Sequence, residues 1–553
     1  MLEFDSGGYE AICIFAQKTG GEDGWLSLED PRGKVQETHM GADWYRQVCF
    51  ALPEKGTYHI RMEGISIVQM YLSEGVDLLE RGVRFLDPEN GGKVDLKNWY
   101  DTPIREQYHF NPFRNWMNDP NGLCWFKGFY HLFYQANPFG QEWNDMYWGH
   151  AVSRDLVHWR HMPYALEPQP NLWRDKERKG GAFSGSAQVV GEEMRLYLTR
   201  HDGPQEDGED TREWQTAAVC RDGIHMEEES PCITEKPEGA SFDFRDPKVQ
   251  RMGDKDYLVL GAAIEGVPSI LLYCMEDGKW KYQGPLLQEK GPGIRTFECP
   301  DFFELDGKCV AAGAWMCNYD ESNRYQMTRC YVGTFDGQEF HVENEQWYDF
   351  GSNFYAAQTF EHEGRRIAVG WISDFYGEHR IRENGTYGSA SLPRELHIRE
   401  NRIYMEPIKE CYELMGERIV KTGKAERIEA LRIPGNCFLV KLELDGERDF
   451  SLTVARAGDD ALSLVRRNGI TGLVSTKKET ERVRFPSDVR NVRYVEIFVD
   501  RRAVEVYLNH GEAAGTKLFY QDDTAGRLEG EFEAGVLNQL EVWNMKSIWN
   551  DKS

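Results

Sequence analysis

The chain has 553 residues, of which 40% are hydrophobic and 13% are aromatic. This length exceeds what one hydrophobic core normally supports, so we expect two or three globular domains. The 65 basic and 92 acidic residues give a net charge of −27. Because this charge repels polyphosphate backbones and anionic lipid, it argues against nucleic acid and membrane surfaces as partners.

Targeting and redox signals are weak in this sequence. The first residues, MLEFDSGGYEAICIF, are not the basic and then apolar stretch of a signal peptide, and no apolar run of membrane-spanning length follows. We therefore expect a cytoplasmic protein. The twelve cysteines have no CxxC pairs, which predicts reduced, mostly buried thiols rather than disulfides or a zinc site. The spacing of His109, His150 and His158 suits structural hydrogen bonding and no metal-ligand set.

Residues 1–102 alternate apolar and polar positions in short runs, which predicts a small β domain of unknown role. After the central region, a linker over residues 401–423 has the periodicity of a short helix starting near Pro407. Residues 424–553 return to alternating segments bounded by Gly, Asp and Asn, as in CFLVKLELDG and YVEIFVDRRAVEVYLN. This pattern is typical of an antiparallel β-sandwich.

Residues 103–400 contain five similar units, each with a short polar motif, an apolar strand, a Gly-containing turn and a second apolar strand. The units start at Asp119, Ser184, Asp246, Glu298 and Tyr355, at intervals of roughly 50 to 65 residues. This spacing predicts a five-bladed β-propeller, and hence an all-β chain. Since the inner strands of a propeller converge on its axis, we expect the carboxylates of Asp119, Asp246 and Glu298 to meet in one funnel.

Several motifs identify a family resemblance. The chain carries, in order, WMNDPNG from Trp116, FYQANP, WGHAVSRDLVHW, FSGS, FRDP, FECPD, YVGTFDGQEF, FYAAQTF and SLPREL ending at Leu396. This ordered set resembles glycoside hydrolase family 32, the β-fructofuranosidases. The carboxy-terminal VEIFVDRRAVEVYLNHGEAAGTKLF is similar to the sandwich domain of that family. The first hundred or so residues lie outside the resemblance.

The resemblance implies roles for the three acids. Hydrolysis of a glycosidic bond needs an acid to protonate the leaving oxygen and a second carboxylate opposite it. Asp119 matches the nucleophile of the family, Glu298 the general acid/base, and Asp246 the carboxylate that holds sugar hydroxyls and stabilises the transition state. Taken alone, NDPNG is a good turn sequence and Glu298 reads as a surface glutamate paired with Arg295; the ordered motifs favour the catalytic interpretation.

The flanking residues suggest different protonation states for two of these acids. Glu298 lies between Phe297 and Cys299, where we expect partial burial to raise its pKa and keep it protonated. Arg245 precedes Asp246, and we expect its guanidinium to lower the pKa of Asp246 if the two side chains meet.

The resemblance also implies a sugar pocket. Asn118 would orient the nucleophile, and aromatic rings with amide and hydroxyl groups would line the fructosyl site. The residues expected to bind substrate are Asn118, Gln135, Trp143, Phe183, Ser184, Arg245 and Tyr355. Asn353 departs from the family, which frequently has an acidic residue there, so subsite details are open.

The sequence therefore predicts a retaining, exo-acting β-fructofuranosidase that releases terminal β-D-fructosyl units from sucrose or short fructo-oligosaccharides through a covalent intermediate. No metal or organic cofactor is expected. A fructosyltransferase and a non-catalytic carbohydrate-binding propeller are the alternatives. The preferred linkage, sucrose 6-phosphate as a substrate, self-association into a homo-oligomer and the role of the first domain stay open.

Overall fold

The computed structural model describes residues 1–204, 208, 210–290, 293–319, 324–375, 385–476, 484–521 and 525–549. Strands make up most of this part of the chain, and its helices are short. The prediction of an all-β protein is confirmed. Among these residues, no helix has the length and apolarity needed to cross a membrane.

The first unit contains two four-stranded antiparallel sheets, which share one apolar core. One sheet runs β1 (Leu2–Asp5), β6 (Thr57–Glu63), β3 (Trp25–Glu29) and β4 (Val35–His39), and the other β5 (Tyr45–Ala51), β2 (Ala11–Lys18), β7 (Ile65–Ser73) and β8 (Arg84–Leu86). Two short helices, α1 (Leu78–Arg81) and α2 (Leu96–Tyr100), begin at the aspartate caps Asp77 and Asp95. Phe129, Val152 and Met162 from the next unit complete this core, so the two units are packed together.

One cysteine prediction is wrong. Cys13 on β2 and Cys49 on β5 are directly opposite each other in the antiparallel register, and they form a disulfide. Sequence spacing could not indicate this pair, because only the register of two separated strands brings the cysteines together. The other ten cysteines are free, and most are buried.

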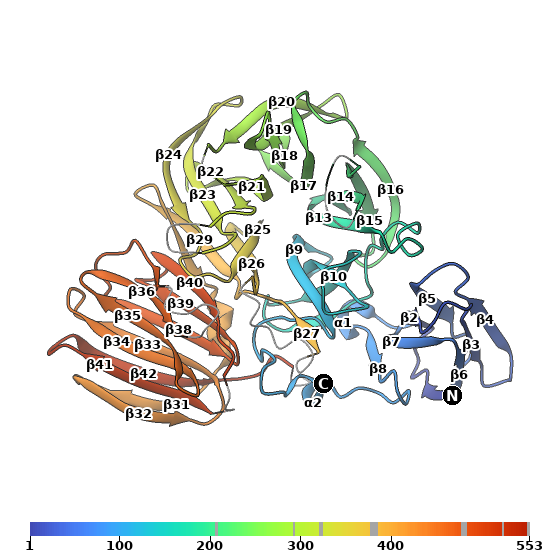
Figure 1. Cartoon of the computed structure of the whole chain (residues 1–553), viewed down its shortest axis with the longest axis horizontal. Helices are drawn as coiled ribbons and strands as arrows, with labels where there is room; N and C mark the ends of the chain where they lie inside the picture. Colours follow the sequence, from blue (N-terminus) through green and yellow to red (C-terminus); the bar gives the residue numbers. More distant parts are fainter. Residues whose placement is uncertain are drawn as a thin grey trace.

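Five antiparallel sheets follow one another along the chain and form a ring (Figure 1). Their strands are, sheet by sheet, β9 (Asn115–Phe126), β10 (Phe129–Asn137), β11 (Tyr147–Ser153) and β12 (Trp159–His161); β13 (Arg178–Val190), β14 (Glu193–Pro204), β15 (Arg212–Cys220) and β16 (Met226–Ile233); β17 (Ala240–Met252), β18 (Lys255–Ile264), β19 (Val267–Glu276) and β20 (Lys279–Gln288); β21 (Phe297–Leu305), β22 (Lys308–Trp315), β23 (Thr328–Phe335) and β24 (Phe340–Trp347); β25 (Phe354–His362), β26 (Arg365–Ile372), β29 (Arg394–Arg399) and β30 (Arg402–Pro407).

The first strand of each sheet lies innermost and contacts the first strands of its neighbours. β9 contacts β13, β13 contacts β17, β17 contacts β21, β21 contacts β25, and β25 returns to β9. The segment after the fifth inner strand closes the ring, because β27 (Thr386–Tyr387) pairs with β9 while β28 (Ser389–Ala390) pairs with β26. The five sequence motifs therefore lie on strands that share one centre.

A break in pairing recurs on these inner strands at the motifs. The register shifts between Met117 and Pro120 on β9, and between Ala182 and Gly185 on β13. Equivalent shifts lie next to Asp246, Cys299 and Ala356, and these three residues have left-handed φ values of 66°, 44° and 51°. A bulge turns a side chain out of the regular alternation, and left-handed backbone in residues other than glycine is concentrated at functional sites.

The expected linker over 401–423 contains two strands. β30 completes the fifth sheet, and β31 (Met415–Thr422) pairs with β42 (Leu537–Met545) in the last unit. The short helix expected near Pro407 is a 3-10 helix over Lys409–Leu414 that lies between these strands.

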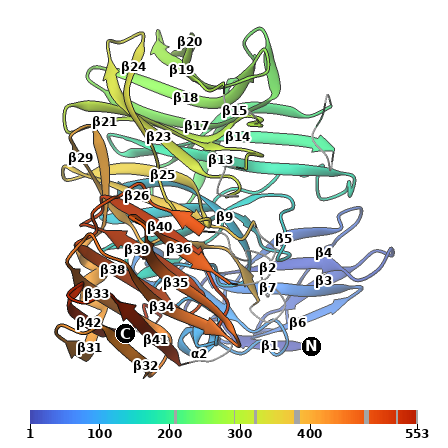
Figure 2. The same ribbon diagram turned by 60° about the vertical axis from the view of Figure 1, so that its left-hand side comes forward.

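The last unit is a pair of six-stranded sheets, seen side on in Figure 2. One runs β31, β42 (Leu537–Met545), β33 (Cys437–Leu444), β38 (Tyr494–Asp500), β39 (Ala503–Leu508) and β40 (Ala513–Leu518); the other runs β32 (Arg427–Ile433), β41 (Gly526–Phe532), β34 (Phe450–Ala457), β35 (Asp460–Arg467), β36 (Ile470–Ser475) and β37 (Arg484–Pro486). Alternate residues of both sheets, such as Val440 and Leu464, pack into one core.

Buried polar groups join this pair of sheets to the ring. His109 lies between Asp500 and Glu505, with ring nitrogens 2.8 and 3.0 Å from their carboxylate oxygens, and Arg394 contacts Glu505 at 2.6 Å. The His150 ring makes a hydrogen bond with His131, and the His158 ring makes one with Asp155. His109, His150 and His158 therefore make structural hydrogen bonds, as the sequence indicated.

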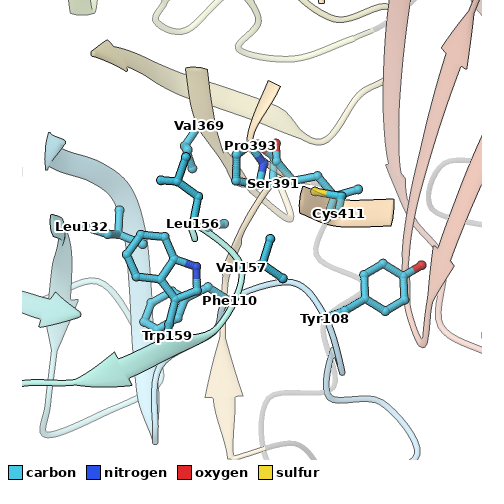
Figure 3. A pocket seen from close by; sticks show the side chains of 12 residues that line it. Tyr108, Phe110, Leu132, Leu156, Val157, Trp159, Val369, Ser391, Pro393 and Cys411 are labelled. Atoms are coloured by element: carbon cyan, nitrogen blue, oxygen red, sulfur yellow. Dashed lines mark hydrogen bonds between the residues drawn. The ribbon is translucent and has the colours of Figure 1, made fainter. Parts of the chain in front are cut away.

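A small apolar cavity lies where the first and fifth sheets meet the segment after the ring. Phe110, Leu132, Trp159 and Val369 are among the side chains that surround it (Figure 3). Its volume of about 10 Å³ is near the minimum for one water molecule. Its lining is mostly apolar, so this cavity is part of the hydrophobic core and is not a candidate for the active site.

Candidate active site

The three candidate carboxylates come from three different sheets and converge around one residue, Cys299. Asp119 is on β9, Asp246 on β17 and Glu298 on β21. The main-chain N–H of Cys299 donates to Asp246 Oδ2 at 2.8 Å, and its thiol lies 3.4 Å from Asp119 Oδ2. Glu298 is the residue before Cys299 in the chain. The side chains that the sequence separates by many residues therefore form one cluster.

Asp119 accepts a hydrogen bond from a residue of the second sheet. The Ser184 hydroxyl donates to Asp119 Oδ2 at 2.6 Å. Burial raises the pKa of Asp119, and the nearby charge of Glu298 also raises it, while the Ser184 hydrogen bond lowers it. Asn118 is buried beside it and accepts a hydrogen bond from Trp116 Nε1 at 2.6 Å.

Glu298 is held by two groups. The Tyr355 hydroxyl donates to Oε2 at 2.7 Å, and Arg245 Nη2 donates to Oε1 at 3.1 Å. The Glu298 side chain is 19% exposed, so it is not the surface glutamate that its sequence context alone would suggest. Arg295 contacts Asp243 at 2.9 Å.

Arg245 lowers the pKa of Asp246, as expected, but the net shift of this pKa is upward. Burial raises the pKa of Asp246 to about 8, and Glu298 and Asp119 raise it as well. Arg245 opposes this shift but does not overcome it, because its guanidinium is engaged by Glu213, Asp243 and Glu298. Neighbouring residues of a strand point to opposite faces, so adjacency in the sequence does not by itself pair the Arg245 guanidinium with the Asp246 carboxylate. Burial and the two neighbouring carboxyl groups therefore favour the protonated form of Asp246.

A set of buried charges behind the carboxylates was missed by the sequence reasoning. Glu213 Oε1 accepts hydrogen bonds from Arg245 Nη1 and His201 Nδ1, both at 2.9 Å. Burial raises the pKa of Glu213, but Arg245 and His201 outweigh it and hold the pKa at about 2. Asp243 contacts the same guanidinium at 2.7 Å. An acid at the start of the apolar strand segment REWQTAAVC was the only signal for Glu213.

The other predicted pocket residues lie at different depths. Gln135 is buried and donates to Ala182 O at 2.8 Å. Phe183 stacks on His201 with ring centroids 4.1 Å apart, and Trp143 meets Phe183 edge-on at 6.0 Å. Trp143 also lines a cleft of about 970 Å³. The structure thus brings Asn118, Ser184, Arg245 and Tyr355 to the carboxylates and puts Trp143 further out.

Asn353, where the sequence departs from the family, faces the last unit. Its side-chain oxygen accepts hydrogen bonds from Lys517 Nζ at 3.1 Å and Leu518 N at 3.0 Å, and its amide donates to Ser373 O at 2.6 Å. The side chain is fully buried. An amide fits this position because it can accept from two donors and donate to a carbonyl.

The cluster is chemically suited to acid/base and nucleophilic steps. Three carboxyl groups share a partly closed site, which raises the pKa of at least Asp119 and Asp246, and such groups titrate as a coupled set. In the part of the chain that the structure describes, no three His, Cys, Asp or Glu side chains are arranged as a metal site.

Family models match two parts of this chain. The model described as "Glycosyl hydrolases family 32 N-terminal domain" matches residues 109–407, and "Glycosyl hydrolases family 32 C terminal" matches residues 458–544. The first match covers the ring of sheets and the carboxylate cluster. The chain belongs to glycosyl hydrolase family 32, which confirms the family predicted from its motifs, and it is a glycosidase.

Relatives and solved structures agree with this assignment. A sucrose-6-phosphate hydrolase of Zymomonas mobilis is 31% identical over 82% of this chain and 94% of its own length. A levanase of Bacillus subtilis is 30% identical, over 82% of this chain and 72% of its own. Among structures, a family 32 glycoside hydrolase from Bifidobacterium adolescentis has a TM-score of 0.94 and 34% identity, and the match covers 100% of both chains. A Bombyx mori beta-fructofuranosidase in complex with sucrose has a TM-score of 0.73 and 26% identity over 82% of this chain and 96% of its own.

Proposed function

We propose that the protein is an exo-acting, retaining β-fructofuranosidase that releases terminal β-D-fructosyl units from sucrose or short fructo-oligosaccharides. The ring of five sheets would be a five-bladed β-propeller carrying the active site, and the last pair of sheets a β-sandwich. The observation that carries the proposal is the contact of Cys299 with both Asp119 and Asp246, next to Glu298. The names of the relatives, which include sucrose-6-phosphate hydrolase and levanase, support fructosides as the substrate class.

Asp119 is the nucleophile in this proposal. One of its oxygens attacks the anomeric C2 of the fructosyl unit, and the bond from C2 to the leaving oxygen breaks as Glu298 gives its proton to that oxygen. In the second step Glu298 takes a proton from water, the water oxygen bonds to C2, and Asp119 leaves as a carboxylate. Ser184 supports this role because its hydrogen bond to Asp119 stabilises the ionised form.

Arg245 and Tyr355 keep Glu298 in place while its proton moves. Both groups donate to Glu298, so they are well placed to stabilise the carboxylate that remains after the leaving oxygen is protonated. We assign Asp246 to the fructosyl hydroxyls, since the Cys299 N–H fixes one of its oxygens and orients the carboxyl group. Asn118, Gln135, Phe183 and Trp143 would bind the sugar around these groups.

A retaining mechanism also predicts how far apart the two catalytic carboxyl groups lie. If Asp119 attacks C2 directly, the carboxyl groups of Asp119 and Glu298 should be about 5 to 5.5 Å apart in the substrate complex, whereas inversion needs about 6.5 to 9.5 Å.

Initial rates on sucrose, 1-kestose, inulin and levan test the function. We expect free fructose as the first product from at least the two short sugars, and a loss of about a hundredfold or more in Asp119→Ala and in Glu298→Gln. Longer oligosaccharides that accumulate at high sucrose would instead indicate a fructosyltransferase. Calorimetric binding without product would indicate a carbohydrate-binding protein.

A further inference from the structure

The cleft of about 970 Å³ is built jointly by the first unit and by the rim of the ring. The first unit contributes Trp44, Tyr45 and Lys18 to its lining, and the rim of the ring contributes Trp143, Lys176 and Lys179. This volume is at the upper end of the range for ligand pockets, so it has room for more than one sugar unit.

The two walls of the cleft are fixed to each other by polar contacts. The main-chain N–H of Trp44 donates to the main-chain oxygen of Trp173 at 2.8 Å, and the Arg174 guanidinium contacts the Asp43 carboxylate at 2.7 Å. The Asp43 side chain is 4% exposed and that of Arg174 is 58% exposed, so the contact lies at the edge of the buried surface between the two units. The first unit thus holds Trp44 in a set position relative to the ring.

The cleft is connected to the carboxylates by a short series of contacts. Trp143 in the cleft meets Phe183 at 6.0 Å, Phe183 precedes Ser184 in the chain, and Ser184 donates to Asp119 at 2.6 Å. A substrate with its terminal fructosyl unit at Asp119 has the rest of its chain on the leaving-group side. That portion would extend outward along this wall.

The cleft combines aromatic rings with amide and charged groups. Trp44 and Trp143 are both half-buried. The ammonium groups of Lys176 and Lys18 lie 3.3 and 5.6 Å from the centroid of the Trp44 ring, and that of Lys179 lies 5.4 Å from the centroid of the Trp143 ring. These cation–π contacts restrain the rings. Aromatic rings beside amide groups, here including Asn144, match the apolar faces and hydroxyls of a sugar.

We propose that this cleft is a binding site for the aglycone part of a fructo-oligosaccharide, with Trp44 of the first unit as a specificity-determining residue. The inference rests on the proposed function and extends it, because it gives the first unit the role of selecting substrate length. Sucrose has only one sugar unit beyond the fructosyl unit, so we expect its cleavage not to depend on Trp44.

The test compares kcat/KM on sucrose, 1-kestose and the tetrasaccharide nystose for wild type, Trp44→Ala and Trp44→Phe. We expect Trp44→Ala to reduce kcat/KM on nystose about three- to tenfold, the size of one lost aromatic contact, to reduce it less on 1-kestose, and to leave sucrose unchanged. Trp44→Phe should recover part of the loss. Trp25→Ala, a half-buried tryptophan of the same unit outside the cleft lining, is the matched control and should behave like wild type on all three sugars.

Two outcomes of this comparison would overturn the inference while leaving the proposed function intact: equal kcat/KM of Trp44→Ala and wild type on nystose, and an equal loss on nystose and sucrose. A further measurement compares Lys176→Met with wild type on sucrose 6-phosphate and nystose. A loss confined to sucrose 6-phosphate would also overturn the inference, because it would make the cleft an anion site. If Trp44→Ala unfolds at a lower temperature than wild type, the length dependence is read from Trp44→Phe. A wild-type protein that cleaves none of these sugars would instead refute the proposed function, and the inference with it.

Discussion

The Ser184 hydroxyl and Asp119 Oδ2 are 2.6 Å apart, and this hydrogen bond joins the second sheet of the ring to the first. The bond favours the ionised form of Asp119, against the burial that raises its pKa. A nucleophilic carboxylate has to be ionised, so Ser184 acts on the protonation state that the proposed reaction uses.

Ser184→Ala should therefore impair activity most at low pH. Without the hydroxyl the pKa of Asp119 rises further, so activity is lost at a higher pH as the solution is acidified, and the acidic limb of the kcat/KM profile moves to higher pH. At the optimum we expect a loss of about tenfold, the size of one hydrogen bond to a charged group. Ser186→Ala, on the same strand but bonded to Pro247 O, is the control. A profile in Ser184→Ala with the acidic limb of wild type would contradict the assignment.

Glu213→Gln tests the buried charges behind Glu298. Breaking the contact with Arg245 leaves a buried guanidinium without one of its carboxylates, so we expect the free energy of unfolding at pH 7 to fall by about 3 to 5 kcal/mol. Since Arg245 also donates a hydrogen bond to Glu298, the fold-decrease in kcat should be larger than the fold-change in KM. Glu193→Gln removes an acid at the surface that is paired with Arg195 and Arg221, and it should lower the free energy of unfolding much less than Glu213→Gln does.

The effect of Glu213→Gln should also depend on pH. The pKa of Glu213 is lowered from 4.5 to about 2, so its stabilising contribution is complete above pH 4.5 and is lost as the pH falls through about 2. The difference in unfolding free energy between wild type and variant, measured by denaturant titration, should therefore shrink from pH 6 to pH 3. A constant difference would show that Glu213 does not stabilise the fold through its charge.

His109 gives a prediction of opposite sign. Burial lowers its pKa, but the hydrogen bonds to Asp500 and Glu505 outweigh burial and raise the pKa from 6.5 to about 9. The stabilisation is therefore complete below pH 6.5 and is lost as the pH rises through about 9. His109→Gln should be less stable than wild type by a margin that is largest at pH 6 and smaller at pH 9.5. His341→Gln, at an exposed site, should show no such trend, and a margin for His109→Gln that grows with pH would refute this account.

The ring and its three carboxylates could be predicted because each motif is local. A polar motif before an apolar hairpin recurs in the sequence, and Asp119, Asp246 and Glu298 follow from the motifs themselves. The partners of these acids could not be predicted. Arg245 is next to Asp246 in the chain, yet its guanidinium contacts Glu298 and Glu213.

Pairings between strands that are distant in the chain could not be predicted from the sequence either. The disulfide of Cys13 and Cys49 depends on the register of β2 and β5, and nothing in either strand's composition sets that register. The cleft beside Trp143 depends on how the first unit packs on the ring, which the separate sequences of residues 1–102 and 103–400 do not encode in any local pattern.

The most direct test of the central claim is to trap the covalent intermediate. Glu298→Gln would be mixed with a β-fructofuranosyl fluoride, whose leaving group needs no proton, then quenched and digested for mass spectrometry. We expect the peptide containing Asp119 to gain the mass of one fructosyl residue, and Asp119→Ala in the same background to abolish the gain. A fructosyl residue on another side chain, or turnover of the fluoride with no adduct at any time point, would contradict Asp119 as the nucleophile.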